Sequence, residues 1–96
     1  MKYYGTIIGV FYEHDTWVDE WFKSVVEEKQ MFCACRYDNS RRILALGDGT
    51  LFVAININDN VKGRRFDKAY IESTIDDDVI NKVIMPMLSL PRLIIG

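Results

Sequence analysis

The chain has 96 residues, of which 49% are hydrophobic and 27% are charged, and its formal net charge at pH 7 is -2. A chain of this length cannot divide its apolar residues between two cores, so we expect a single α/β domain over residues 1–96, and the composition excludes intrinsic disorder. The small negative charge excludes a global attraction to nucleic acid or to an anionic membrane, so such binding would need a local basic patch.

No stretch of the sequence predicts a membrane span or a secretory signal. The longest mostly apolar runs, such as residues 51–57, fall well short of the roughly 20 residues that a spanning helix needs. Glu13, His14 and Asp15 follow the apolar run near the N-terminus, where a signal peptide would carry small residues. We therefore expect a cytoplasmic protein that has no contact with a membrane.

The first part of the chain predicts a strand, a helix and a second strand. Residues 3–12 combine aromatic and β-branched residues with two glycines, which is typical of a buried strand. Asp15 or Thr16 is expected to cap an amphipathic helix, because the apolar residues that follow recur with helical spacing. Residues 31–37 predict the second strand, which the turn at residues 38–40 should end.

Three aromatic residues lie within that helical pattern, namely Trp17, Trp21 and Phe22. Their spacing indicates core packing, whereas exposure of this side would instead mark a protein interface.

A hairpin is predicted next along the chain. Residues 42–46 and 50–56 flank Gly47-Asp48-Gly49, whose glycines tolerate the positive φ angles of a tight turn. In the second arm one face is wholly aliphatic, and we expect this face to meet the helices.

The last part of the chain predicts a strand over residues 66–72, a helix that begins at Thr74, and a short strand over residues 92–95. Pro86 should end the helix near Ile84 or bend it there, because proline has no amide hydrogen to donate. The full order of elements predicts the α/β class, with a small mixed β-sheet of about five to six strands packed by two α-helices.

The stretch RRILALGDGTLFVAININDNVKGRRFDKAYIEST, residues 41–74, resembles the middle of the ATPase domain of phage terminase large subunits and related helicase-like P-loop ATPases. In that family a hairpin precedes a loop of the form RG-x-x-hydrophobic-D and the strand that carries the acidic Walker B pair. Residues 62–67 resemble the loop, and residues 68–73 lie where the Walker B strand would be. The resemblance implies a degenerate P-loop-ATPase-like fold.

The sequence departs from that family where the chemistry would occur. It has no G-x-x-x-x-G-K-[ST] segment, whose amides and lysine hold the phosphates. Glu72 and Ser73 stand where the family has its two Walker B acids. We therefore expect that ATP hydrolysis is lost, that no cofactor is bound and that the chain is not an enzyme.

Residues 36–68 are locally basic, with seven lysines and arginines against four aspartates. This excess predicts a partner-binding surface made of Lys62, Arg64, Arg65 and Lys68, together with Arg41 and Arg42 on the hairpin. The alternative is a solvated loop and hairpin edge, where basic residues discourage aggregation through the edge of the sheet.

The sequence offers two candidate metal sites. Glu72, Asp76 and Asp77 could hold magnesium at the end of a strand, but the favourable field at the start of a helix explains the aspartates without a metal. A zinc site at His14 with the two thiols, Cys33 and Cys35, lacks four ligands at a recognised spacing, and the thiols are expected to be reduced and half-buried.

Taken together, these observations predict a non-catalytic, phage-type accessory or regulatory protein that binds a macromolecular partner in the host cytoplasm, for example to inhibit a host factor. A protein partner is expected first, and a second copy of the chain is also compatible with the sequence. The alternatives are a small metal-dependent phosphodiesterase or nucleotide-handling enzyme, and a nucleic-acid-binding module.

Overall fold

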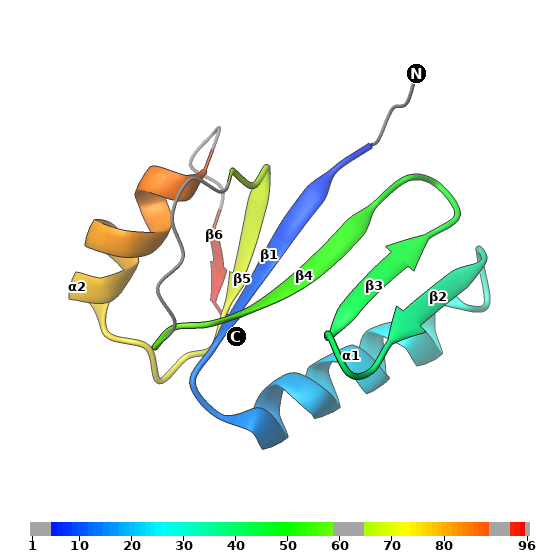
Figure 1. Ribbon diagram of the computed structural model, residues 1–96, viewed down its shortest axis with the longest axis horizontal. Coiled ribbons are helices and arrows are strands. Elements are labelled where there is room, and N and C mark those ends of the chain that lie inside the picture. The colour runs from blue at the N-terminus through cyan, green and yellow to red at the C-terminus, as the bar shows by residue number, and fades with distance from the viewer. Residues whose placement is uncertain (1–4, 59–64, 89–92, 96) are drawn as a thin grey trace.

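The computed structural model describes residues 5–58, 65–88 and 93–95. Within them one mixed sheet has the strand order β2-β3-β4-β1-β5-β6 (Figure 1). The strands are β1 (Ile7–Tyr12), β2 (Cys35–Asp38), β3 (Ile43–Leu46), β4 (Leu51–Asn56), β5 (Lys68–Ile71) and β6 (Leu93–Ile95). This sheet and its two helical segments confirm the predicted α/β class.

The sheet has a parallel half and an antiparallel half. Strand β1 is parallel to both of its neighbours, β4 and β5, and β5 is parallel to β6. Strands β2 and β4 each run antiparallel to β3, which lies between them, and this confirms the predicted hairpin between β3 and β4. Its turn requires a glycine at one position only, because Gly49 has a φ of 96°.

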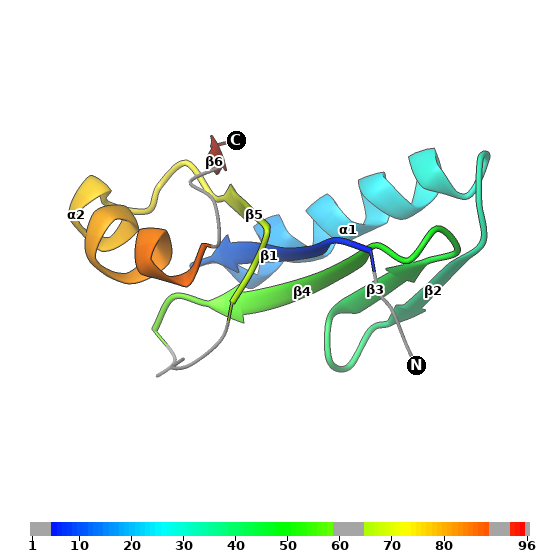
Figure 2. The same ribbon diagram turned by 90° about the horizontal axis from the view of Figure 1, so that it is seen from above.

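The helical segments cover opposite faces of the sheet. Helix α1 (Asp15–Lys29) packs on the face that carries Val10 and Tyr12 of β1, and its own Phe22 is fully buried there. The helical segment that begins at α2 packs on the other face, together with Phe11 of β1. Figure 2 shows α1 lying along the sheet, well apart from α2.

Strand β4 contributes to both apolar clusters. Val53 and Ile55 lie on the aliphatic face and pack with the α2 cluster, whereas Phe52 packs with the α1 cluster. The expectation that the aliphatic face meets the helices is therefore correct for the α2 segment only.

The boundaries at the two ends of α1 differ from those predicted. His14, and not Asp15 or Thr16, occupies the N-cap position, and no side chain caps the helix. At the other end the amides of Phe32 and Cys33 donate to the carbonyl of Lys29, at 2.9 and 3.0 Å. This tight turn delays β2 until residue 35.

The second helical segment begins at Asp77, three residues later than predicted, because the amide of Ile75 donates to the carbonyl of Glu72 and closes a turn. It is short and irregular. The segment consists of α2 (Asp77–Val79), the wider turns of η1 (Ile80–Ile84) and the tighter 3-10 turn of η2 (Met85–Met87). The winding therefore changes at Ile80 and again at Met85, directly before Pro86, which has no amide hydrogen to donate.

No helix within the described ranges is long and apolar enough to cross a bilayer.

Candidate functional site

Part of the predicted partner-binding surface lies at the start of β5. Lys62 and Arg64 fall outside the residues that the structure describes. Arg65 is exposed, and Lys68 is half-buried on β5 beside Ile8, near the beginning of β1.

The two hairpin arginines lie at the other end of the sheet. Arg41 is exposed in the turn between β2 and β3, 3.8 Å from Asp38. Arg42 adopts a φ of 55° there. Its guanidinium donates to both carboxylate oxygens of Asp19, at 2.8 and 3.1 Å, and to the hydroxyl of Tyr12 at 3.1 Å.

Arg42 therefore ties this turn to α1, and the bidentate pair holds the pKa of Asp19 below its usual value. The four described basic residues do not form one continuous patch.

Glu72 is the one buried charged side chain among the described residues, with 4% of its surface exposed. It directly follows β5, while Glu13 and His14 directly follow β1. Its Oε1 accepts hydrogen bonds from the amides of Glu13 and His14, at 2.7 and 3.0 Å, and its Oε2 lies 2.5 Å from Nδ1 of His14. One carboxylate thus joins the carboxyl ends of two parallel strands.

These contacts determine the charge state of both groups. Burial alone would raise the pKa of Glu72, but the hydrogen bonds from the two amides and the imidazole outweigh it and hold the pKa below its usual value. The hydrogen bond to Glu72, and then its charge, raise the pKa of His14 above the usual 6.5. The pair therefore favours a carboxylate beside an imidazolium.

The position of this pair is one where open α/β sheets bind ligands, because β1 leads to α1 on one face and β5 leads to α2 on the other. The His14 side chain is 60% exposed, so its Nε2 could exchange a proton with a ligand. The nearby Thr74 hydroxyl donates to Glu13 at 2.6 Å and is not paired with the imidazole.

The residues of the magnesium alternative do not converge. Asp76 and Asp77 are exposed at the start of α2, and the oxygens of Glu72 are occupied by the amides and by His14. Over the described part of the chain, no three acidic, histidine or cysteine residues are placed to hold a metal ion. Glu72 holds two chain segments together instead.

A first prediction concerns His14, which is the single histidine of the chain. We expect its pKa, followed by the proton NMR signal of the imidazole, to lie above 6.5, and Glu72→Gln to return it toward that value. The interaction of protonated His14 with Glu72, which raises this pKa, stabilises the fold fully below pH 6.5. This stabilisation is lost as the pH rises through the folded-state pKa of His14. A His14 pKa that does not respond to Glu72→Gln would contradict the pairing.

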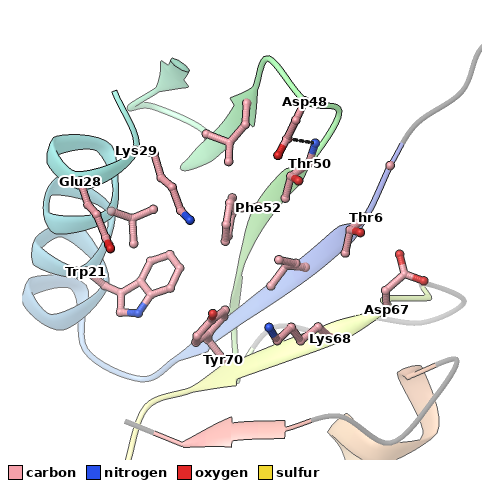
Figure 3. A pocket seen from close by; sticks show the side chains of 14 residues that line it. Thr6, Trp21, Glu28, Lys29, Asp48, Thr50, Phe52, Asp67, Lys68 and Tyr70 are labelled. Atoms are coloured by element: carbon pink, nitrogen blue, oxygen red, sulfur yellow. Dashed lines mark hydrogen bonds between the residues drawn. The ribbon is translucent and has the colours of Figure 1, made fainter. Parts of the chain in front are cut away.

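A groove lies at the opposite end of the sheet from this pair, between α1 and the amino-terminal parts of β1, β4 and β5, and has a volume of about 800 Å³ (Figure 3). Trp21, Val25 and Lys29 line it from one side of α1. Because these residues recur at helical spacing, they share one face of the helix.

The strands provide the floor and the other wall of the groove. Ile8 of β1 and Phe52 of β4 form the floor, and Lys68 and Tyr70 of β5 form the wall. The rings of Trp21 and Tyr70 are in contact across the groove, with centroids 5.0 Å apart. The groove therefore combines an aromatic interior with lysines on both sides.

The lysines and the aspartates that line the groove differ in their contacts. Figure 3 shows the ammonium groups of Lys29 and Lys68 turned toward the hollow. Across the residues that the structure describes, neither ammonium group forms an ion pair. By contrast, the carboxylate of Asp48 accepts a hydrogen bond from the amide of Thr50 at 2.9 Å, and the carboxylate of Asp67 accepts one from the amide of Ile7 at 2.8 Å.

The sequence identified only part of this groove. Lys68 belongs to the predicted surface. Trp21 was predicted to pack in the core, and it is half-buried against the α1 cluster while one part of it lines the groove. Lys29 and Tyr70 were missed, because only the pairing of β5 with β1 brings them to the same hollow. A lysine one turn beyond an apolar helical stripe does not by itself indicate a binding site in a sequence.

Compared with protein-family models, with curated proteins and with solved structures, the chain gives no match.

Proposed function

We propose that this chain is a non-catalytic binding protein that holds a protein partner in the groove between α1 and β5. One observation carries this proposal: two lysines that form no ion pair with the described residues face an aromatic hollow from opposite walls. Exposed aromatic area is typical of surfaces that bind other molecules, and charges that form no ion pair can attract and orient a partner of opposite charge.

The geometry at Glu72 favours binding over catalysis. A metal-dependent phosphodiesterase would need carboxylate oxygens that are open to a metal ion, and those of Glu72 accept hydrogen bonds from the chain itself. An accessory or regulatory role of the phage type, including inhibition of a host factor, is a form that such binding could take. The likeness to a P-loop ATPase stays a prediction.

The test is capture of the partner from the native cell by the tagged chain. Changing both groove lysines to glutamate, Lys29→Glu with Lys68→Glu, is expected to remove the captured protein, because the groove then repels the charges it attracted. The matched control is Lys23→Glu with Lys82→Glu, which makes the same change of net charge on exposed residues outside the groove.

Melting temperatures of both double variants should be compared first, so that loss of folding is not mistaken for loss of binding. Equal capture by the wild type and by a folded groove variant would contradict the proposed function.

A further inference from the structure

Within the described residues, no helix covers the β5 side of the face on which α1 packs. On β5 the side chains that point to this face are Lys68 and Tyr70, since Ala69 and Ile71 belong to the opposite cluster. Parallel strands are normally covered by helices on both faces. Among the described residues none supplies a helix there, and the groove occupies that place beside α1.

The pairing of the strands around the groove indicates which secondary structure a bound segment would have. Strand β4 pairs with β3 and β1, strand β1 with β4 and β5, and strand β5 with β1 and β6. The strands under the groove therefore have both edges paired and cannot add an extended peptide as a further strand. A segment that lies here must satisfy its own backbone hydrogen bonds, as an α-helix does.

The charge of the groove indicates the chemistry of that helix. Lys29 and Lys68 face the hollow from opposite walls. The carboxylates of Asp48 and Asp67 keep their negative charge, but they are turned to the backbone amides of Thr50 and Ile7, so the two ammonium groups are the charges that a ligand inside the hollow would meet. Glu28 is exposed and also lines the groove. A helix with an apolar stripe and acidic residues on both sides of it would pair with the two lysines and pack against the aromatic interior.

The aromatic rings of the groove do not suit stacked bases. Trp21 is surrounded by Phe22, Phe52 and Tyr70, with ring centroids 5.2, 5.7 and 5.0 Å away. The ammonium of Lys68 lies over the ring of Tyr70, 5.5 Å from its centroid. Single-stranded nucleic acid needs open ring faces, so these contacts favour a peptide.

We propose that the groove between α1 and β5 accepts an acidic amphipathic α-helix of a partner protein, which covers a part of the sheet that no helix of the described residues covers. This inference rests on the proposed function and specifies its partner. The partner helix would lie beside α1, at an interaxial distance of about 8–10 Å.

The probe is a fluorescein-labelled peptide of about 18 residues, long enough to form a helix, with leucines at helical spacing and glutamates on both sides of them. We expect its fluorescence anisotropy to rise when the wild-type chain is added. Lys29→Gln with Lys68→Gln should weaken binding by about fivefold to tenfold, as the loss of two exposed ion pairs implies, and Lys23→Gln with Lys82→Gln should leave it unchanged.

Three changes of probe complete the experiment. Replacing the glutamates of the peptide by glutamine should weaken binding as the groove variant does, and replacing its leucines by serine should abolish it. A labelled oligothymidylate should not bind; binding that the groove variant loses would assign the groove to nucleic acid and overturn the inference.

The outcomes separate this inference from the proposed function. If no acidic peptide binds while the groove lysines still govern capture of the native partner, the helix inference is wrong and the proposed function survives. If sedimentation shows self-association that the groove variant abolishes, a second copy of the chain occupies the groove and the inference is likewise overturned. Equal peptide affinity in both double variants would also contradict it.

Discussion

Phe22→Ala is expected to lower the free energy of unfolding by about 3–5 kcal/mol, a large part of the stability of a domain of this size. Phe22 is fully buried between α1 and the sheet. Its ring stacks on Tyr37 with centroids 5.0 Å apart and meets the ring of Trp21 edge-on at 5.2 Å. Removing it leaves a cavity under the helix that forms one wall of the groove.

Urea denaturation followed by circular dichroism measures this change. Phe22→Leu is the matched control, because it keeps an apolar side chain of similar volume and should cost about 1.5 kcal/mol or less. If the alanine variant proved as stable as the leucine variant, Phe22 would not anchor α1 as we describe.

Glu72→Ala is expected to lower the free energy of unfolding by about 2–3 kcal/mol at neutral pH, since it leaves two backbone amides without their acceptor. Those amides belong to Glu13 and His14, at the point where β1 ends and α1 begins. Glu72→Gln should fall between the wild type and the alanine variant, because it keeps one acceptor oxygen and loses the charge.

The effect of Glu72 should depend on pH with a defined sign. Its folded-state pKa lies below the usual 4.5, so its stabilisation is present above pH 4.5 and is lost as the pH falls through the folded-state pKa. The difference in stability between the wild type and Glu72→Ala should therefore shrink in acid. A difference that stays constant down to the lowest pH at which the wild type folds would show that the charge of Glu72 contributes nothing.

The strongest local patterns in the sequence predicted the corresponding elements correctly. The helical recurrence of apolar residues from Trp17 onward predicted α1, and the glycine turn at residues 47–49 predicted the β3–β4 hairpin. Both signals are local, since side-chain periodicity and turn chemistry act over a few residues.

The sequence could not predict features that depend on strand order. The sequence suggests Glu72 as a metal ligand, but its observed role depends on β5 lying next to β1. This strand pairing brings Glu72 into contact with Glu13 and His14, from which it is separated by 59 and 58 positions in the sequence. Arg42 was placed on a binding surface, yet it pairs with Asp19 across 23 positions. Long-range pairing of this kind leaves no periodic trace in a single sequence.

The central claim is that the groove between α1 and β5 binds the partner, and the two tryptophans of the chain test it directly. Trp21 lines the groove and Trp17 does not. When the acidic amphipathic peptide is titrated into the isotope-labelled chain, we expect the indole N–H signal of Trp21 to shift further than that of Trp17, together with the amides of Lys29 and Tyr70. Shifts centred on His14 and Glu72, with Trp21 unmoved, would contradict the claim.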